Sequence, residues 1–106
     1  MLDPKFEVPN SIDSSLPHRF DIHELTNDLI LESSQGVYVF TKRHQVSDYV
    51  FEHDHIEVKS TDDFSKIEMK EIQRAKEKGA NCICTIWCNK HEMQQLIEDV
   101  LNQTKA

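Results

Sequence analysis

A nearly continuous apolar segment, residues 80–88, constrains the fold of this chain more than any other feature of the sequence. It reads ANCICTIWC and is interrupted only by one asparagine and one threonine. A strand with one exposed face alternates apolar and polar residues, whereas a strand covered on both faces can be apolar throughout. The segment therefore predicts a buried strand in a sheet that has helices packed against it.

The residues before this strand predict a helix that ends at Gly79, a residue type that commonly follows the last helical turn. A hydrophobic staple and a capping box at its start are supplied by Phe64, Ser65, Glu68 and Met69. Helical spacing then predicts three buried positions, which are Met69, Ile72 and Ala75.

A second set of cap residues follows the apolar segment, at Asn89, Glu92 and Met93. It predicts a final helix with one apolar face turned toward the sheet. The side chains expected on that face are Met93, Leu96, Ile97, Val100 and Leu101.

The N-terminal part of the chain divides near residue 19. Residues 1–19 contain all three prolines, so we expect an irregular arm there and a single domain over residues 20–106. A first helix is predicted from residue 21 to about residue 33, because Asp21 can cap it and Glu24 can complete a capping box.

Three strands are predicted between the first and second helices. Residues 37–40 are rich in β-branched and aromatic residues, and residues 48–51 and 55–59 are expected to form a hairpin about a turn at residues 52–54. The resulting order is helix, three strands, helix, strand, helix. We therefore expect an α/β fold with a mixed sheet flanked by helices.

Length, charge and cysteine content limit the functional classes. The chain has 106 residues, a formal net charge of −7 and three cysteines, all within residues 82–88. Their odd number and close spacing argue against a disulfide framework and favour a reducing compartment. No apolar run approaches the ~18 residues of a membrane span and no signal-peptide pattern opens the chain, so we expect a cytoplasmic protein.

The strongest functional signal is the tripeptide Glu57-Val58-Lys59 at the end of a predicted strand. Side chains alternate along a strand, so Glu57 and Lys59 are expected to share one face, opposite the face of Ile56 and Val58. Asp48 opens the preceding predicted strand. Two carboxylates that converge on a hard cation, with a lysine beside them, can support metal-assisted hydrolysis of a phosphodiester.

These residues and this order of elements resemble the PD-(D/E)xK, or restriction-endonuclease-like, nuclease superfamily. The pattern covers roughly residues 20–88 and is most similar to archaeal Holliday-junction resolvases and small stand-alone nuclease modules. The residue before Asp48 is Ser47, where the superfamily motif has proline, and the chain is acidic where resolvases are basic.

The resemblance implies a DNA endonuclease that depends on Mg²⁺ or Mn²⁺. Asp48, Glu57 and the backbone carbonyl of Val58 would hold the cation. Lys59 would stabilise the developing charge, and Gln73 would assist from the following helix. A further carboxylate would come from the first helix, as Glu24, Asp28 or Glu32. Because so small a chain presents one cleft, cutting both strands of DNA would need a homodimer.

Other interpretations of the same residues stay open. Glu57 and Lys59 can instead form the solvated outer face of an edge hairpin, where charges discourage further strand pairing. Glu24 competes as a helix-capping residue, and Gln73 as a solvated helix residue. The net charge of −7 favours a small acidic binding protein, of immunity or inhibitor type, that covers a basic protein partner. A nuclease fold without activity is a third alternative.

Overall fold

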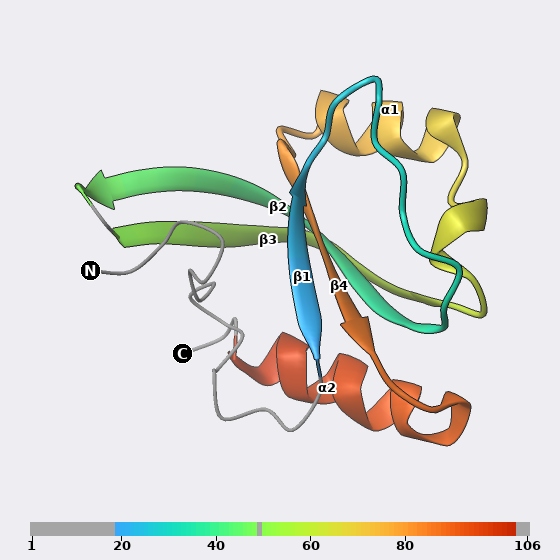
Figure 1. The fold of residues 1–106 in the computed structure, drawn as a ribbon. Helices are drawn as coiled ribbons and strands as arrows, with labels where there is room; N and C mark the ends of the chain where they lie inside the picture. The colour runs from blue at the N-terminus through green and yellow to red at the C-terminus, as the bar shows by residue number, and fades with distance from the viewer. Residues whose placement is uncertain (1–18, 49, 104–106) are drawn as a thin grey trace.

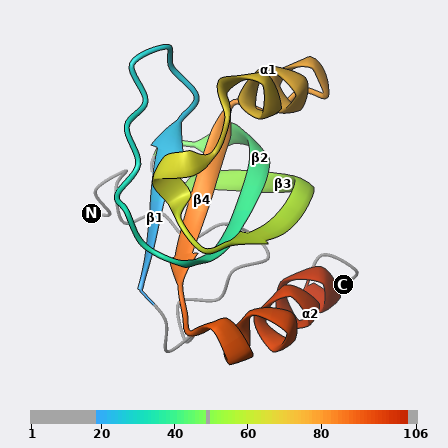
Figure 2. The same ribbon diagram turned by 90° about the vertical axis from the view of Figure 1, so that its right-hand side faces the viewer.

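The computed structural model describes residues 19–48 and 50–103. They form a compact α/β domain in which a four-stranded sheet lies between two α-helices. Helix α1 (Met69–Glu77) covers one face of the sheet and α2 (Met93–Gln103) covers the other (Figures 1 and 2). The predicted irregular arm lies outside the described residues, except for Arg19.

All neighbouring strands of the sheet are antiparallel, so the prediction of a mixed sheet is wrong. The strands are β1 (Phe20–Glu24), β2 (Gly36–Ser47), β3 (Val50–Thr61) and β4 (Cys82–Trp87), and their spatial order is β1-β4-β2-β3. The connection through α1 joins β3 to β4, and these two strands run in the same direction because each is antiparallel to β2. However, β2 lies between them, so no parallel pair forms.

The apolar segment forms β4, and its prediction as a buried strand is confirmed. Its side chains alternate between the two faces of the sheet, so that Cys84 and Ile86 pack toward α2 and Ile83 packs toward α1. The α2-side cluster consists of Val37, Val39, Cys84, Ile86, Cys88, Met93, Leu96 and Val100. The α1-side cluster consists of Leu25, Leu31, Tyr38, Phe40, Phe64, Ile72, Ala75, Ala80 and Ile83.

Helix α1 begins differently from the prediction. A short 3-10 turn, Phe64–Lys66, precedes it, and Asp63 caps this turn by accepting a hydrogen bond from the backbone N–H of Ser65 at 2.9 Å. Glu68 then occupies the N-cap position of α1 without a side-chain cap. The predicted capping box of Ser65 and Glu68 is therefore wrong, because the carboxylate of Asp63 reaches the free N–H groups first.

Helix α2 begins where the sequence predicts. Asn89 and Glu92 form a reciprocal capping box around the 3-10 turn Lys90–Glu92, which leads directly into α2.

Helical spacing also predicts most of the buried face of each helix. The confirmed buried positions are Ile72, Ala75, Met93, Leu96 and Val100. Two predictions are wrong, since Met69 is 47% exposed and Leu101 is 42% exposed. Each of these residues lies near an end of its helix.

The predicted first helix does not form, and its residues belong to β1 and the loop that follows. Phe20 and Ile22 pack against the α2-side cluster, whereas Leu25 packs in the α1-side cluster. β1 pairs with β4 along its whole length. This pairing gives partners to backbone groups of β4 that would otherwise be buried without them, and it outweighs the local capping signal of Asp21 and Glu24.

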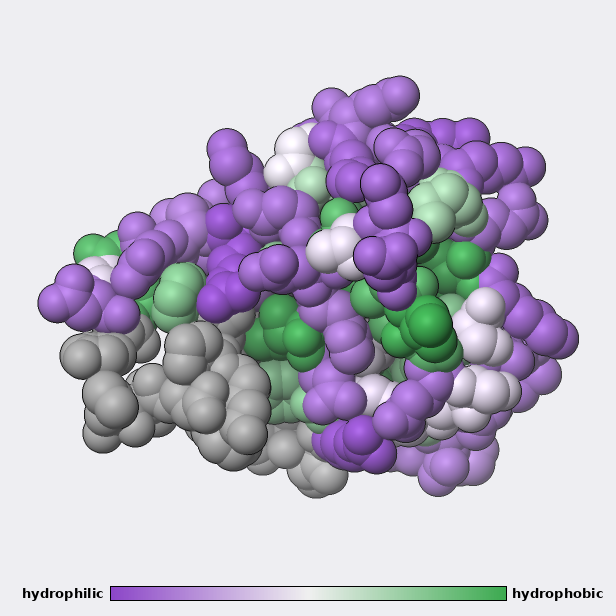
Figure 3. Space-filling model, turned by 45° about the horizontal axis from the view of Figure 1, so that its top comes forward, coloured by the Kyte–Doolittle hydropathy of each residue, from purple (hydrophilic) through white to green (hydrophobic). Residues whose placement is uncertain are grey.

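β2 and β3 form one long hairpin, so the predicted turn at residues 52–54 is wrong. Ser47 pairs with Val50, and the chain reverses between them. Because β4 pairs with β2 only over residues 36–41, the distal part of the hairpin projects from the domain (Figure 1). We call this part, residues 42–48 and 50–54, the hairpin arm. Figure 3 shows a mainly hydrophilic surface along the arm and over α1.

Candidate functional site

The structure does not bring Asp48 close to Glu57. Glu57 lies opposite Phe40 in the hairpin, whereas Asp48 follows Ser47 at the tip. Ser47 lies seven residue steps beyond Phe40 along β2, which corresponds to about 23 Å at ~3.3 Å per residue. A divalent cation binds its oxygen ligands within about 2.6 Å, so one ion cannot contact both carboxylates. The metal pair expected from the motif is not assembled.

Glu24 is also far from Glu57. It ends β1 at the opposite edge of the sheet, three strand spacings or about 14 Å away from β3. There its carboxylate lies 3.7 Å from the guanidinium of Arg43. Val58, the expected carbonyl ligand, packs its side chain against the α2-side cluster.

The remaining predicted site residues lie on other parts of the surface. Gln73 is exposed on α1, and its amide donates a weak hydrogen bond to Sδ of Met69 at 3.9 Å. Asp28 and Glu32 lie in the loop between β1 and β2, where Glu32 is 3.6 Å from the guanidinium of Arg19. Within the described part of the chain, none of these three predicted residues contacts Lys59.

Glu57 and Lys59 share the face of β3 that α1 covers, which agrees with their spacing. The prediction that the side chains of Ile56 and Val58 share the other face is wrong, because Ile56 packs against the α1-side cluster and Val58 packs against the α2-side cluster. The cause is a β-bulge, since Phe40 lies opposite Glu57 while the next residue of β2 lies opposite His55.

Lys59 lies at the centre of a network of ion pairs and hydrogen bonds. Its ammonium donates to Oε1 of Glu71 at 2.8 Å and lies 3.3 Å from Oε1 of Glu57. The hydroxyl of Tyr38 donates to the same oxygen of Glu71 at 2.7 Å. Lys78 approaches the second oxygen of Glu57, at 3.9 Å. We call these five residues the Lys59 network.

The Lys59 network fixes the protonation of its central members around neutral pH. The hydrogen bond to Glu71 raises the pKa of Lys59, although burial opposes its charged form. Burial also opposes ionisation of Glu71, but hydrogen bonds from Lys59 and Tyr38 outweigh it and hold the pKa of Glu71 below its usual value. Burial, and then the hydrogen bond to Glu71, raises the pKa of Tyr38. Lys59 is thus a cation, Glu71 an anion and Tyr38 neutral.

The ammonium of Lys59 lies close to the carboxylates of both Glu57 and Glu71, so these two carboxylates share it as their cation. Residues 19–48 and 50–103 contain no group of three or more His, Cys, Asp or Glu side chains arranged to hold a metal ion.

A pocket of about 300 Å³ opens beside the Lys59 network, between the end of β3 and the start of α1. We call it the β3–α1 pocket. Its lining includes four basic and two acidic residues, which are Lys59, Lys66, Lys70, Arg74, Glu68 and Glu71. The lining therefore carries a net charge of +2 in a chain whose net charge is −7.

The four cationic side chains of the pocket differ in how closely they pair with carboxylates. Lys59 pairs with Glu71, and the ammonium of Lys70 lies 3.3 Å from Glu68. Lys66 and Arg74 form no ion pair within 4.0 Å of another residue of the described ranges, but Lys66 interacts with Asp63 and Arg74 with Glu71 at longer range. These two cations are therefore held less closely than Lys59 and Lys70.

Our interpretation of the sequence missed this pocket. Lys66, Lys70 and Arg74 are spaced four residues apart, and such spacing aligns side chains along one side of a helix. That row of cations was the available signal. Lys59 joins it only in the folded chain, because it comes from β3.

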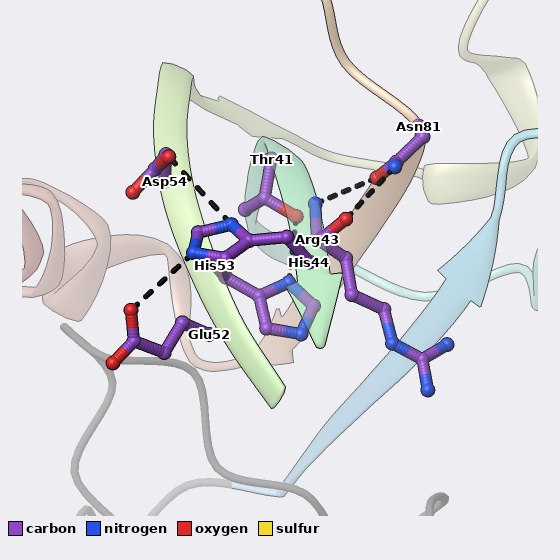
Figure 4. Close-up of polar contacts among 7 residues, drawn as sticks. All are labelled: Thr41, Arg43, His44, Glu52, His53, Asp54 and Asn81. Atoms are coloured by element: carbon purple, nitrogen blue, oxygen red, sulfur yellow. Dashed lines mark hydrogen bonds and ion pairs between the residues drawn. The ribbon is translucent and has the colours of Figure 1, made fainter. Parts of the chain in front are cut away.

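A larger hollow, of about 410 Å³, lies at the base of the hairpin arm. Its arginine, Arg43, is held by the protein itself, with its guanidinium 4.1 Å from the ring centroid of Phe51 and 3.7 Å from Glu24. Asn81 fixes the backbone of Arg43 through two hydrogen bonds, of 2.7 and 3.0 Å (Figure 4). Because Arg43 already contacts Phe51 and Glu24, this hollow has fewer charged groups available to bind a ligand than the β3–α1 pocket has.

The histidines of the arm take part in contacts between β2 and β3. His44 lies between Glu52, at 3.3 Å, and Asp54, at 3.8 Å (Figure 4). His53 is buried, and its Nδ1 is hydrogen-bonded to the hydroxyl of Thr41 at 2.8 Å. The three cysteines are buried and free, as expected for small core residues.

No family model, curated protein or solved structure matches this chain. In the described ranges, no helix combines the length and the apolar character that crossing a membrane requires.

Proposed function

We propose that the protein binds a phosphate-bearing ligand in the β3–α1 pocket. The observation that carries the proposal is the gathering of four cations around one hollow of an acidic chain. Like charges repel, so collecting them at one point opposes folding unless an anion compensates them. The two glutamates of the lining compensate only half of this charge. A bound phosphate group would compensate the rest.

The side chains of the pocket suit phosphate chemically. Arg74 can donate two parallel hydrogen bonds to phosphate oxygens, and Lys66 and Lys70 supply point charges. The start of α1 adds a weaker contribution, because Glu68 leaves the first N–H groups of this helix without a side-chain cap. Such N–H groups and the helix dipole favour an anion nearby. The four cations remain the main attraction.

The motif predicts a restriction-endonuclease-like fold and metal-dependent cleavage of DNA. These proposals have less support than the binding of phosphate in the β3–α1 pocket. Cleavage would need a cation held by Asp48 and Glu57, and these residues lie at levels of the hairpin about 23 Å apart. Lys59, the predicted catalytic cation, instead lines the pocket. There it can contact a phosphate group without a metal ion. We therefore propose binding without hydrolysis.

Titration of the full chain with inorganic phosphate, followed through the backbone amide signals in NMR spectra, tests the proposal. We expect saturable shifts at Ser60 and Lys70, which line the pocket. Lys66→Gln and Arg74→Gln should each weaken phosphate binding by about tenfold or more, because each removes a positive charge and its charge-assisted hydrogen bonding to phosphate. Lys76→Gln is the matched control, since it makes the same charge change on α1 outside the lining.

The comparison has a clear negative outcome. If the shifts do not saturate at constant ionic strength, or if Lys76→Gln weakens binding as much as Arg74→Gln does, phosphate has no specific site. Either result would overturn the proposed function.

A further inference from the structure

We propose that the β3–α1 pocket selects a small phosphomonoester, bound as its dianion, over phosphodiesters and polynucleotides. This inference rests on the proposed phosphate-binding function and names the class of ligand. It follows from the charge of the pocket, the charge of its surroundings and its size.

The charged residues of the pocket and of the neighbouring Lys59 network divide into two groups. Lys59 and Lys78 face Glu57 and Glu71 in the Lys59 network, so this group is neutral as a whole. The other group consists of the lining residues Lys66, Lys70, Arg74 and Glu68, whose net charge is +2, while Asp63 faces Lys66 from outside the lining. A phosphomonoester dianion neutralises this second group. A phosphodiester, with one negative charge, leaves half of it uncompensated.

The surroundings of the pocket oppose a long polyanion. Since the lining carries +2 and the whole chain −7, the rest of the chain carries −9. Asp62 and Asp63 follow immediately after Thr61 of the lining. Proteins that bind nucleic acid present a basic stripe along which successive phosphates can lie. Here the backbone of a nucleic acid that leaves the pocket past Thr61 would meet repulsion from Asp62 and Asp63.

The size of the pocket agrees with a small ligand. Its volume of about 300 Å³ is at the lower end of the ~300–1,000 Å³ typical of small-molecule sites. The phosphate would lie among the cations. Ile67 offers an apolar surface for the remainder of the molecule. We therefore expect a compact phosphorylated metabolite.

Tyr38, Lys59 and Glu71 of the pocket keep one charge state in the range where a phosphomonoester titrates. No histidine is among the lining residues, whose charged and titratable members are Tyr38, Lys59, Lys66, Glu68, Lys70, Glu71 and Arg74. Asp63 faces Lys66 from outside the lining. The pKa of Glu71 is lowered, and the pKa values of Lys59 and Tyr38 are raised, away from this range. The second pKa of a phosphomonoester is about 6, so any strong pH dependence must come from the ligand.

Phenyl phosphate and methyl phenyl phosphate form a matched pair of probes, because they share the aryl group and differ in carrying a monoester or a diester. Each is titrated into the full chain at about pH 5 and about pH 7.5, at constant ionic strength, with the Ser60 and Lys70 amides as reporters. We expect phenyl phosphate to bind about tenfold more tightly at the higher pH, because the dianion fraction rises about tenfold. Methyl phenyl phosphate and a thymidine oligonucleotide should bind at least about tenfold more weakly at that pH.

The outcomes separate this inference from the function on which it rests. If both esters bind equally and neither depends on pH, the selectivity for a dianion is overturned while phosphate binding stands. Tighter binding of the oligonucleotide than of phenyl phosphate would also overturn it, in favour of a nucleic-acid site. If neither ester binds at either pH, the proposed function fails and this inference fails with it.

Discussion

The ammonium of Lys59 lies 2.8 Å from Oε1 of Glu71, so β3 and α1 meet through a part-buried ion pair. The motif predicts that Asp48 is the second carboxylate beside Glu57 and Lys59. In the structure, that second carboxylate belongs to Glu71. The pair neutralises one of the four cations of the β3–α1 pocket. A change at Glu71 should therefore affect stability and ligand binding in opposite directions.

Glu71→Gln should lower the free energy of unfolding by about 1 kcal/mol, because the charged partner of Lys59 is lost while an acceptor for Tyr38 is kept. The same substitution should strengthen phosphate binding by about threefold, since it removes a negative charge from the lining. Urea denaturation and NMR titration measure the two effects. Glu77→Gln, at the other end of α1, is the control and should change phosphate affinity little. Weaker phosphate binding in Glu71→Gln would contradict the assignment of the pocket.

Asp48→Ala should leave phosphate affinity unchanged and alter stability by no more than about 0.5 kcal/mol, because Asp48 lies at the exposed tip of the hairpin arm. Lys59→Gln, which removes a lining cation, should weaken phosphate binding. A DNA cleavage assay with Mg²⁺ or Mn²⁺ completes the comparison. Cleavage by the wild type that is lost in Asp48→Ala would restore the nuclease hypothesis.

His55 should make the domain less stable in mild acid. Burial, with a further contribution from His53, lowers the pKa of His55 to about 4, although Asp54 opposes this shift. Between about pH 6.5 and pH 4, the unfolded chain therefore binds a proton at His55 that the folded chain excludes, and stability falls as the pH falls. Partial exposure of the ring reduces the effect to about 1–2 kcal/mol.

Urea denaturation at several pH values checks this dependence. His55→Gln should flatten the loss of stability between about pH 6.5 and pH 4, whereas His91→Gln, at an exposed position, should not. An unchanged pH profile in His55→Gln would show that other groups cause the dependence.

Thr85→Val should stabilise the domain by about 1 kcal/mol. Thr85 is 1% exposed, and its hydroxyl has no hydrogen-bond partner within the described ranges. Thr41→Val is the matched control, because the hydroxyl of Thr41 is equally buried but bonded to His53. It should destabilise by about 1–2 kcal/mol. Melting temperatures of the two variants that move in the same direction would refute this explanation.

Gly36→Ala should be strongly destabilising, by about 3 kcal/mol, because strand β2 has no space for a side chain at this position. An added Cβ would lie 2.0 Å from the backbone oxygen of Ile86 and 2.8 Å from the ring of Phe64. Gly79→Ala is the comparison, since its Cβ would meet nothing within 4 Å and only the φ of +104° opposes it. Its effect should be about 1–2 kcal/mol. Thermal unfolding of both variants measures the difference.

Local sequence was sufficient for the elements whose signals do not depend on distant partners. The apolar segment, residues 80–88, predicts a covered strand from its own composition, and the capping box of Asn89 and Glu92 forms within four residues. The local sequence predicted a helix from the capping residues Asp21 and Glu24, but this segment forms β1 instead. It pairs with the edge of β4 that has no other partner strand in the described ranges. Unpaired backbone groups in a core are more costly than a lost helix cap.

The candidate site was only partly visible in the sequence. The period of a strand was enough to predict that Glu57 and Lys59 share a face, and the four-residue spacing of Lys66, Lys70 and Arg74 was also there to be read. No local rule could give the register of the hairpin, because the turn after Ser47 carries no Asn-Gly or Asp-Gly signal. That register separates Asp48 from Glu57.

The sequence by itself therefore determined a covered central strand, the two helices that flank it in the chain and the shared face of Glu57 and Lys59. Only the tertiary structure decided the partner of Lys59. The antiparallel register carried Asp48 away to the tip of the hairpin, and packing of α1 on the sheet brought Glu71 to Lys59. The physical reason is that spacing along one element follows from backbone geometry, whereas contacts between elements depend on which surfaces bury together.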